Sequence, residues 1–479
     1  MKRYQLAWAE EQPLLKLSLN TERYRTHRHI VGNVLDDALI WGTGTYIESY
    51  FNSTDVKTKV NKDGEKFLTK EIAENTLKEI DATAKNFWIA VKNIREQAKK
   101  KLTDEQLMKL FDQLVAVSRD VYAYFMCSRE EVMHAVETRL VALLKQKFPA
   151  TSQDALITLT TPTEADVLYH EKKDWMNVIP NPTEEVIQQH VEKYPLLLYN
   201  ITSEEKAIEL MKNKAQKQKP DELRAELQEN KEKRRQLKEK QEQLLKEIGS
   251  EEIERLAGFI RRMALGRLKL KECWGGTSYY LLDFFRQLAE KAGFSTYEVM
   301  NFYTREDMEN LIKHGKNISK EELEKRKQNY LLHYLNGKLC LYSGEEARRM
   351  KKELLDGSLP KRDTTSFKGM IANTGKVTGR VKLVKVADME ELNKIVKTLS
   401  KDEHILVTGM TNPTMVILLD KVKGIITDEG GMACHAAIVS REFGVPCLVG
   451  CKIATQVLKD DDLIELDATS GIVRKVGTP

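Results

Sequence analysis

The chain has 479 residues, a length that predicts two to four domains. Hydrophobic residues make up 41% of it, so the chain can form packed cores and is not intrinsically disordered. Charged residues make up 31%, but the net charge is only +5, and so small an excess argues against nucleic acid as a partner, which would require a concentrated basic surface.

The cysteines and the start of the chain indicate where the protein works. The chain has six cysteines, and Cys447 and Cys451 are not spaced like zinc-ribbon ligands, so no metal site is predicted. Residues 1–17 lack the apolar core of a signal peptide, and no apolar run is long enough to span a bilayer. We therefore expect reduced thiols, no membrane contact and a cytoplasmic location.

Residues 1–356 are predicted to form a large all-α region. Apolar residues three and four positions apart recur through it, as at Leu107, Leu110 and Leu114. Residues 203–247 are rich in Lys, Glu and Gln of nearly balanced charge. This balance favours a long solvated helical hairpin over a tail that binds nucleic acid.

The helical pattern of the sequence ends near residue 357. Gly357 and Pro360 interrupt a polar stretch, which predicts a hinge linker over residues 357–367. Apolar and polar residues then alternate over residues 377–383, the pattern of a half-buried strand. Short apolar runs and helical stretches follow in turn, so residues 368–479 are predicted to form a compact α/β domain.

The most informative segment is residues 427–446. A predicted strand ends at Ile426, and Gly430 and Gly431 then permit a tight turn and a close approach of the backbone to a ligand. A helix is predicted to begin at His435, followed by small and apolar residues. The segment therefore predicts a strand, a glycine turn and a helix that starts on a histidine.

A histidine at a helix N-terminus suits phosphate chemistry. The free N–H groups there disfavour a charged imidazolium, so His435 tends to stay neutral and nucleophilic. The same groups can hold the negative charge once the ring is phosphorylated, and a histidine relay splits one difficult transfer into two easier ones. A structural histidine at a helix start is the commoner arrangement, and the residues alone leave that alternative open.

The segment resembles the signature of the phosphohistidine domain of phosphoenolpyruvate synthase and pyruvate phosphate dikinase. The matching positions are Gly430, Gly431, Cys434, His435, Ala436, Ala437 and Arg441. The resemblance extends over residues 368–476 and implies a swivelling, mobile domain of the β/β/α type. It implies that His435 is the catalytic residue, and that the phosphate is supported by Thr411, Thr427, Gly430, Gly431, Cys434 and Arg441.

Ala433 and Arg441 each bear on how the segment works. Many relatives have Thr where this chain has Ala433, so regulatory phosphorylation at that position is not expected. Arg441 suits a phosphoryl group because its planar guanidinium donates two parallel hydrogen bonds. The alternative for Arg441 is a salt bridge to Glu442 or Asp428.

The rest of the chain departs from phosphoenolpyruvate synthase. We find no ATP-grasp pattern or glycine-rich phosphate loop before the histidine domain, and no pyruvate-binding barrel after it. The layout resembles the last two domains of rifampin phosphotransferase. This implies a separate nucleotide-binding subunit of the ATP-grasp type as partner, which supplies ATP and Mg²⁺, with phosphoenolpyruvate as the other candidate donor.

The same layout implies that the helical region binds a small-molecule acceptor with a hydroxyl group. His29, in the basic cluster that it forms with His27 and Arg28, is a candidate base for that hydroxyl, although a solvated helix face is the commoner explanation. Two functions thus remain: a phosphotransferase component, which the intact motif favours, or a non-catalytic regulatory protein that responds to phosphate.

Overall fold

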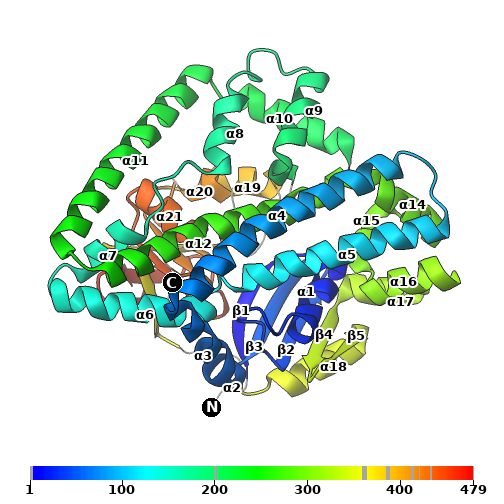
Figure 1. The fold of residues 1–479 in the computed structure, drawn as a ribbon, viewed down its shortest axis with the longest axis horizontal. Coiled ribbons are helices and arrows are strands. Elements are labelled where there is room, and N and C mark those ends of the chain that lie inside the picture. Colours follow the sequence, from blue (N-terminus) through cyan, green and yellow to red (C-terminus); the bar gives the residue numbers. More distant parts are fainter. Residues whose placement is uncertain are drawn as a thin grey trace. The chain divides into compact units, whose positions relative to one another are not determined.

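The computed structural model describes residues 4–198, 201, 203–358, 364–384, 389–411, 415–419, 421–431 and 434–477 (Figure 1). The chain forms two compact units. Unit 1 consists of Met1–Leu68, Arg129–Thr138 and Ser319–Pro479, and unit 2 of Thr69–Ser128 and Arg139–Ile318. Unit 2 is therefore an insertion in the sequence of unit 1, and a short segment of unit 1 interrupts it.

The prediction of an all-α region over residues 1–356 is wrong, because unit 1 contains an antiparallel sheet of five strands. The strands are β1 (Tyr4–Glu11), β2 (Asp37–Thr43), β3 (Tyr46–Asn52), β4 (Tyr330–Leu335) and β5 (Lys338–Ser343), in the order β1-β3-β2-β4-β5. The blue strands β1–β3 and the yellow-green strands β4 and β5 lie side by side in it (Figure 1).

The strands escaped prediction because most of their residues are buried on both faces. All but two residues of β2 and all but the last of β4 are buried, so neither strand shows an alternation of apolar and polar residues. A local signal did exist at Asn336-Gly337, which joins β4 to β5 with both residues at positive φ, 49° and 86°. Asn-Gly between two apolar runs is typical of a β-hairpin.

Short helices accompany this sheet in unit 1. They are α1 (Leu14–Thr26), α2 (Ser53–Asp55), α3 (Asn61–Gly64), α17 (Lys320–Gln328) and α18 (Gly344–Leu355), with a π-turn at Val56–Val60 and a 3₁₀-turn at Glu65–Leu68. Helix α18 packs on β4 and β5, and its Ala347 and Leu355 share a core with residues of four strands, among them Leu39 and Leu331. One face of the sheet is thereby covered.

Unit 2 is helical throughout its described residues. Its helices are α4 (Lys70–Ala98), α5 (Asp104–Met126), most of α6 (Glu130–Lys147), α7 (Ser152–Thr160), α8 (Val167–Trp175), α9 (Glu184–Lys193), α10 (Glu204–Lys217), α11 (Pro220–Ile248), α12 (Glu251–Gly275), α13 (Thr277–Tyr280), α14 (Leu282–Ala292), α15 (Thr296–Phe302) and α16 (Arg305–His314), with a 3₁₀-turn at Pro195–Leu198. The segment predicted as a hairpin, residues 203–247, forms α10 and α11. Helix α10 packs on α9, and α11 packs on α7 and α8.

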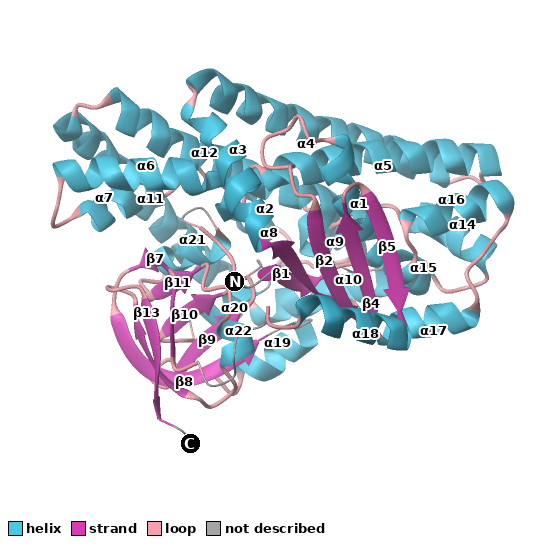
Figure 2. Cartoon of the chain, turned by 90° about the horizontal axis from the view of Figure 1, so that it is seen from below, coloured by secondary structure: helices cyan, strands magenta, loops and turns pink. Residues whose placement is uncertain are grey.

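The C-terminal part of unit 1 is an α/β structure, as the sequence predicts. Its eight strands are β6 (Ser366–Lys368), β7 (Met370–Asn373), β8 (Lys376–Val384), β9 (His404–Thr408), β10 (Gly424–Thr427), β11 (Cys447–Val449), β12 (Leu463–Asp467) and β13 (Ile472–Gly477), in the order β6-β13-β12-β8-β9-β10-β11-β7. The central strands β8, β9, β10 and β11 are parallel, and the outer strands pair antiparallel. Figure 2 shows the strands of both sheets in magenta.

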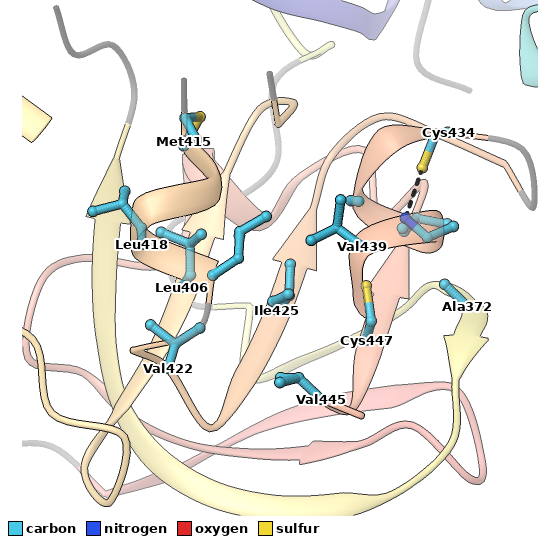
Figure 3. Close-up of a cluster of buried hydrophobic side chains, with 14 of the residues drawn as sticks. Ala372, Leu406, Met415, Leu418, Val422, Ile425, Cys434, Val439, Val445 and Cys447 are labelled. Atoms are coloured by element: carbon cyan, nitrogen blue, oxygen red, sulfur yellow. Dashed lines mark hydrogen bonds between the residues drawn. The ribbon is translucent and has the colours of Figure 1, made fainter. Parts of the chain in front are cut away.

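Side chains on the two faces of this second sheet form two cores. Its helices are α19 (Met389–Val396), α20 (Val416–Leu419), α21 (His435–Glu442) and α22 (Ala454–Val457). Leu406 and Ile425 point into the core under α20 and α21 (Figure 3), whereas their neighbours Ile405 and Ile426 point into the other core, together with residues of β12 and β13. This alternation fixes the register of β9 and β10 and so the position of the loops that follow them.

The predicted hinge, residues 357–367, lies within unit 1, and residues 359–363 of it lie outside the described residues. At one end, Ser358 is buried and its Oγ accepts a hydrogen bond of 3.2 Å from the Tyr4 backbone N–H. At the other end, β6 begins at Ser366. No helix among the described residues is both long and apolar enough to cross a membrane.

Candidate phosphohistidine site

His435 is the first residue of α21, in the loop that follows β10. The backbone N–H groups of Asp428 and Glu429 donate to the carbonyls of Thr408 and Gly409, at 3.1 and 3.0 Å, so the pairing of β10 with β9 continues past the end of β10. The predicted strand, turn and helix are therefore present, with His435 at the carboxyl end of the parallel strands. Open α/β sheets commonly place their ligand sites at this end.

Gly430 makes the turn because its backbone has φ 114°, a conformation that side chains rarely adopt. A Cβ atom at this position would lie 2.5 Å from Sγ of Cys434. Two independent constraints therefore require glycine at position 430. Gly431, by contrast, does not have a positive φ, so its backbone conformation does not require glycine.

Thr411 is the predicted site residue that the structure places against His435. Oγ1 of Thr411 lies 2.9 Å from Nδ1 of His435, and the Thr411 side chain is buried. The half-buried imidazole is therefore oriented by a hydroxyl on the loop that follows β9. If Nδ1 carries the proton and donates to Oγ1, the lone pair of the neutral ring is on Nε2.

Cys434 is the N-cap of α21. Its buried Sγ accepts a hydrogen bond of 3.4 Å from the Ala437 N–H. A sulfur acceptor is weaker than the Ser, Thr, Asp or Asn oxygen common at this position. The cap residue beside His435 thus satisfies one N–H of the first turn with a small, buried side chain.

The loop is also held by Asp428, a residue that the sequence analysis did not single out as supporting the site. Its buried carboxylate accepts hydrogen bonds from the N–H groups of Ala454 and Thr455 and from the Thr455 hydroxyl. The hydroxyl of the predicted residue Thr427 is fully buried and donates to the Glu429 carbonyl. The bonds of Asp428 thus tie the loop after β10 to α22, and the bond of Thr427 holds the start of that loop to the end of β10.

Arg441 lies in the last turn of α21, and its Nε donates a hydrogen bond of 2.9 Å to the Ala372 carbonyl of β7. Burial lowers the pKa of Arg441 to about 10, against the opposing influence of Cys434, Cys447 and Glu137. The guanidinium is therefore still charged at neutral pH, and one of its N–H groups ties α21 to the sheet. The two predicted salt-bridge partners of Arg441 were Glu442 and Asp428. The carboxylate of Asp428 accepts hydrogen bonds from Ala454 and Thr455 of α22.

His29 is not part of the hydrogen-bonded group around His435 that the described residues form. It is exposed in the turn after α1, where its ring stacks on His27 with centroids 5.9 Å apart. Arg28, between them, forms a 2.8 Å ion pair with Asp36. Ala433, the site of the missing regulatory threonine, lies outside the described residues.

The described residues contain no group of three or more His, Cys, Asp or Glu side chains that could hold a metal ion.

Comparison with known proteins identifies the class of this domain. Residues 400–471, which include β9 to β12 and the whole His435 loop, match the family "PEP-utilising enzyme, mobile domain". The C-terminal part of the chain therefore belongs to the mobile domains of the phosphoenolpyruvate-utilising enzymes.

Several curated relatives of the chain are named as phosphoenolpyruvate synthases. The chain is 48% identical over 106 residues, 22% of its length, to a probable phosphoenolpyruvate synthase of Methanothermobacter thermautotrophicus, and covers 14% of that protein. It is 47% identical over 109 residues, 23% of its length, to the phosphoenolpyruvate synthase of Pyrococcus furiosus, of which it covers 12%. The chain thus matches only a small part of either relative.

A third relative matches more of the chain. An uncharacterised phosphotransferase of Bacillus subtilis, YvkC, is 30% identical over 203 residues, which are 41% of this chain and 23% of that protein. This alignment is longer than residues 368–479, so it must include part of the region before the mobile domain. The similarity to a phosphotransferase is therefore not confined to the histidine loop.

Proposed function

We propose that the chain is the histidine-carrying component of a phosphotransferase, in which His435 accepts a phosphoryl group and passes it to the hydroxyl of a small-molecule acceptor. The observation that carries the proposal is the 2.9 Å contact between Thr411 Oγ1 and His435 Nδ1 at the start of α21. When Oγ1 accepts a hydrogen bond from Nδ1–H of the neutral ring, the nucleophilic nitrogen is Nε2, on the other side of the ring. The family match and the names of the relatives agree with phosphoryl transfer.

Transfer takes two substitution steps at the phosphorus atom. The Nε2 lone pair attacks the phosphorus atom, the bond from phosphorus to the donor oxygen breaks, and that oxygen leaves with the electron pair. In the second step an acceptor hydroxyl oxygen attacks the phosphorus, its proton goes to a base, and the N–P bond breaks to restore neutral His435. Throughout, Thr411 holds Nδ1, and the N–H groups at the start of α21 favour the negative phosphoryl group.

The donor and the acceptor define the finer part of the proposal. A separate ATP-grasp subunit would present ATP with its Mg²⁺, and phosphoenolpyruvate is the other candidate donor. The region before the mobile domain would bind the acceptor, as in the layout of rifampin phosphotransferase, and the exposed His29 is a candidate base there. The competing function is a regulatory protein whose His435 senses phosphate without turnover.

Mass spectrometry of acid-labile phosphate tests the proposal. The full chain is mixed with phosphoenolpyruvate, or with ATP and each ATP-grasp chain encoded beside it, and His435→Ala is treated in parallel. We expect one labelled residue, His435, no label in His435→Ala, and discharge of the label when the acceptor is added. Label that persists in His435→Ala would refute the assignment, and label that no acceptor discharges would favour the regulatory alternative.

A further inference from the structure

Strand β5 is an edge strand of the first sheet, joined to β4 by the two-residue turn Asn336-Gly337 (Figure 2). In such a hairpin the residues that flank the turn exchange both backbone bonds, and bonded pairs then alternate with non-bonded pairs. From Lys338 onward, every second residue of β5 therefore bonds to β4. The residues between them, Leu339 and Leu341, direct their N–H and C=O groups away from the sheet, and no hydrogen bond among the described residues reaches these groups.

The opposite edge of the same sheet, β1, is occupied by other parts of unit 1. The Ala9 N–H donates to Glu429 at 3.0 Å, and the Ala7 carbonyl accepts a hydrogen bond of 2.7 Å from Arg129. Within the described part of unit 1, the first sheet is thus open only at β5. The edge strands of the second sheet, β6 and β7, have three and four residues against six in β5, and very short edge strands resist pairing.

The open edge favours a second copy of the chain as the added strand. Because β1 is occupied, β5 of one copy can extend the sheet only by pairing with β5 of another, a two-fold contact that closes at a dimer. Ser343 is less available for this pairing, since its hydroxyl donates to Glu322 of α17 at 2.9 Å. The free stretch is therefore Lys338–Tyr342, with Cys340 at its centre. A two-fold axis at Cys340 pairs Leu339 of each copy with Leu341 of the other.

This register also brings opposite charges together. It places the exposed Lys338 of one copy opposite Tyr342 of the other. Glu346, in the first turn of α18, lies close to Tyr342, because burial, Cys340 and Glu346 together raise the pKa of Tyr342 above its ordinary value. The Glu346 side chain is 59% exposed, and its ion pair with Arg349 is long, at 3.9 Å. Its carboxylate can therefore meet Lys338 of the other copy, and this contact occurs twice in the dimer.

We propose that β5 is a dimerisation edge, at which two copies of the chain pair antiparallel about a two-fold axis at Cys340 and join their first sheets into one. The paired stretch is shorter than the about 20–30 residues a side of a stable interface, so the dimer is weak and its population depends on concentration. The dimer does not rest on the proposed function, since β5 lies outside the His435 loop.

Cys340 reports on this pairing. It is exposed, whereas the other five cysteines are buried. On the axis the two Cys340 residues form a non-bonded pair with Cα atoms about 4.5 Å apart, a separation that a disulfide spans. Diamide serves as the oxidant of the full chain: the two thiols lose their hydrogens, the S–S bond forms, and diamide is reduced to its hydrazine. We expect a disulfide-linked dimer in the wild type and none in Cys340→Ser.

Ile89→Cys in the Cys340→Ser background is the matched control. Ile89 is 58% exposed and lies on α4, so a thiol there meets another copy only by random collision. Cross-linking through Cys340 should be many times faster than in this control. Equal rates in the two proteins would overturn the dimerisation edge.

Sedimentation velocity tests the backbone pairing without a covalent link. The average mass of the wild type should rise with concentration and level off at the dimer. Leu341→Pro removes an N–H that points outward and leaves the bonds of β5 to β4 in place, so this variant should stay monomeric with an unchanged far-UV circular dichroism spectrum. A wild type that stays monomeric at every concentration, or that grows beyond a dimer, would overturn the proposal.

A charge exchange keeps the test decisive if Leu341→Pro does not fold. Lys338→Glu should weaken the dimer, and Lys338→Glu combined with Glu346→Lys should restore it. Lys57→Glu, at an exposed lysine of unit 1 outside the sheet, should leave the dimer as in the wild type. Wild-type dimerisation in Lys338→Glu, or no recovery in the exchanged pair, would show that β5 is not the contact. None of these measurements involves phosphate, so the dimer and the proposed function can fail separately.

Discussion

In the proposed function, Thr411 positions His435 so that Nε2 is the nitrogen that reacts. A donor N–H at Nδ1 leaves the lone pair on Nε2, and a hydroxyl at 2.9 Å can hold that tautomer in place. Because Thr411 is buried, water cannot easily replace its hydroxyl. In the proposed function, the loop after β9 therefore holds the ring before any phosphoryl donor binds.

Thr411→Val should therefore slow phosphorylation of His435 about fivefold, the effect of losing roughly 1 kcal/mol of hydrogen bonding. Thr411→Ser keeps the hydroxyl and serves as the control, with a rate near that of the wild type. The rates follow from mass spectrometry of the labelled chain over time. Equal rates for Val and Ser at this position would remove Thr411 from the site.

Arg441→Lys separates a phosphate contact from a purely structural one. Lysine lacks the planar fork, so a bidentate phosphate contact is lost, and so is the 2.9 Å bond from Nε to Ala372. We expect slower transfer from His435 together with a lower melting temperature. If the variant has a lower melting temperature but transfers phosphate at the wild-type rate, then Arg441 only ties α21 to β7 through the Ala372 carbonyl.

The sequence predicted the local part of this site and missed the distant part. Gly430, Cys434 and His435 lie within six residues of one another, so their turn and helix start could be recognised from residue types alone. Asp428 and Glu429 lie in the same segment, but their partners are Thr455 in one case and Ala9 and Arg129 in the other. No pattern within the segment indicates which distant backbone or side chain will meet a buried carboxylate.

Among the strands, Asp37 shows what holds the first sheet together. Its buried carboxylate accepts hydrogen bonds from the hydroxyl of Tyr4 in β1, from the amide of Asn52 in β3 and from the imidazole of His333 in β4. One residue of β2 thus links all the other strands except β5. No local pattern in the sequence indicates this role, because the partners lie at the distant positions 4, 52 and 333.

Asp37→Asn should lower the free energy of unfolding of unit 1 at neutral pH by about 1–3 kcal/mol. Burial alone raises the pKa of Asp37, but the hydrogen bonds from His333, Tyr4 and Asn52 outweigh it and hold the pKa below its ordinary value. This stabilisation is present above the pKa of the unfolded carboxyl group, about 3.9, and is lost as the pH falls through the lower folded value.

Urea unfolding of wild type and variant at pH 7 and near pH 3 measures this effect. The difference between the two proteins should shrink in acid, because below about pH 3.9 the unfolded wild-type chain binds a proton that the folded carboxylate takes up only at lower pH. Asp36→Asn is the comparison, since Asp36 forms partly exposed ion pairs with Arg28 and Lys59, and such pairs contribute less than a buried carboxylate. A difference that is the same at both pH values would mean that the ionised carboxylate is not what stabilises the sheet.

For the molecule as a whole, we predict that residues 368–479 move as a rigid body during transfer. A histidine that meets a donor on one protein and an acceptor on another surface cannot serve both from one position. A disulfide between Glu130→Cys and Gly431→Cys can test this, because a Cβ on Gly431 would lie 3.6 Å from the Glu130 Cβ, within the usual range for a disulfide.

The oxidised double variant should fail to complete the transfer cycle, and reduction with dithiothreitol should restore it. The reduced form of the same protein is the matched control, since it carries both substitutions without the constraint. A cross-linked protein that completes the cycle as fast as its reduced form would show that transfer requires no movement of the domain.

The insertion of unit 2 has a consequence for how the protein is made. Strand β2 pairs with β4, and the bonded residues Asp37 and His333 are 296 positions apart. A ribosome adds about 5–20 residues per second, so the nascent β2 waits about 15–60 s for its neighbour. During that time the outer edge of β2 has unpaired backbone groups next to apolar side chains such as Trp41. Another nascent chain could pair with this open edge. Synthesis thus completes the helical unit 2 while the sheet that began the chain is still open, and it is during this interval that we expect chaperones to engage the protein.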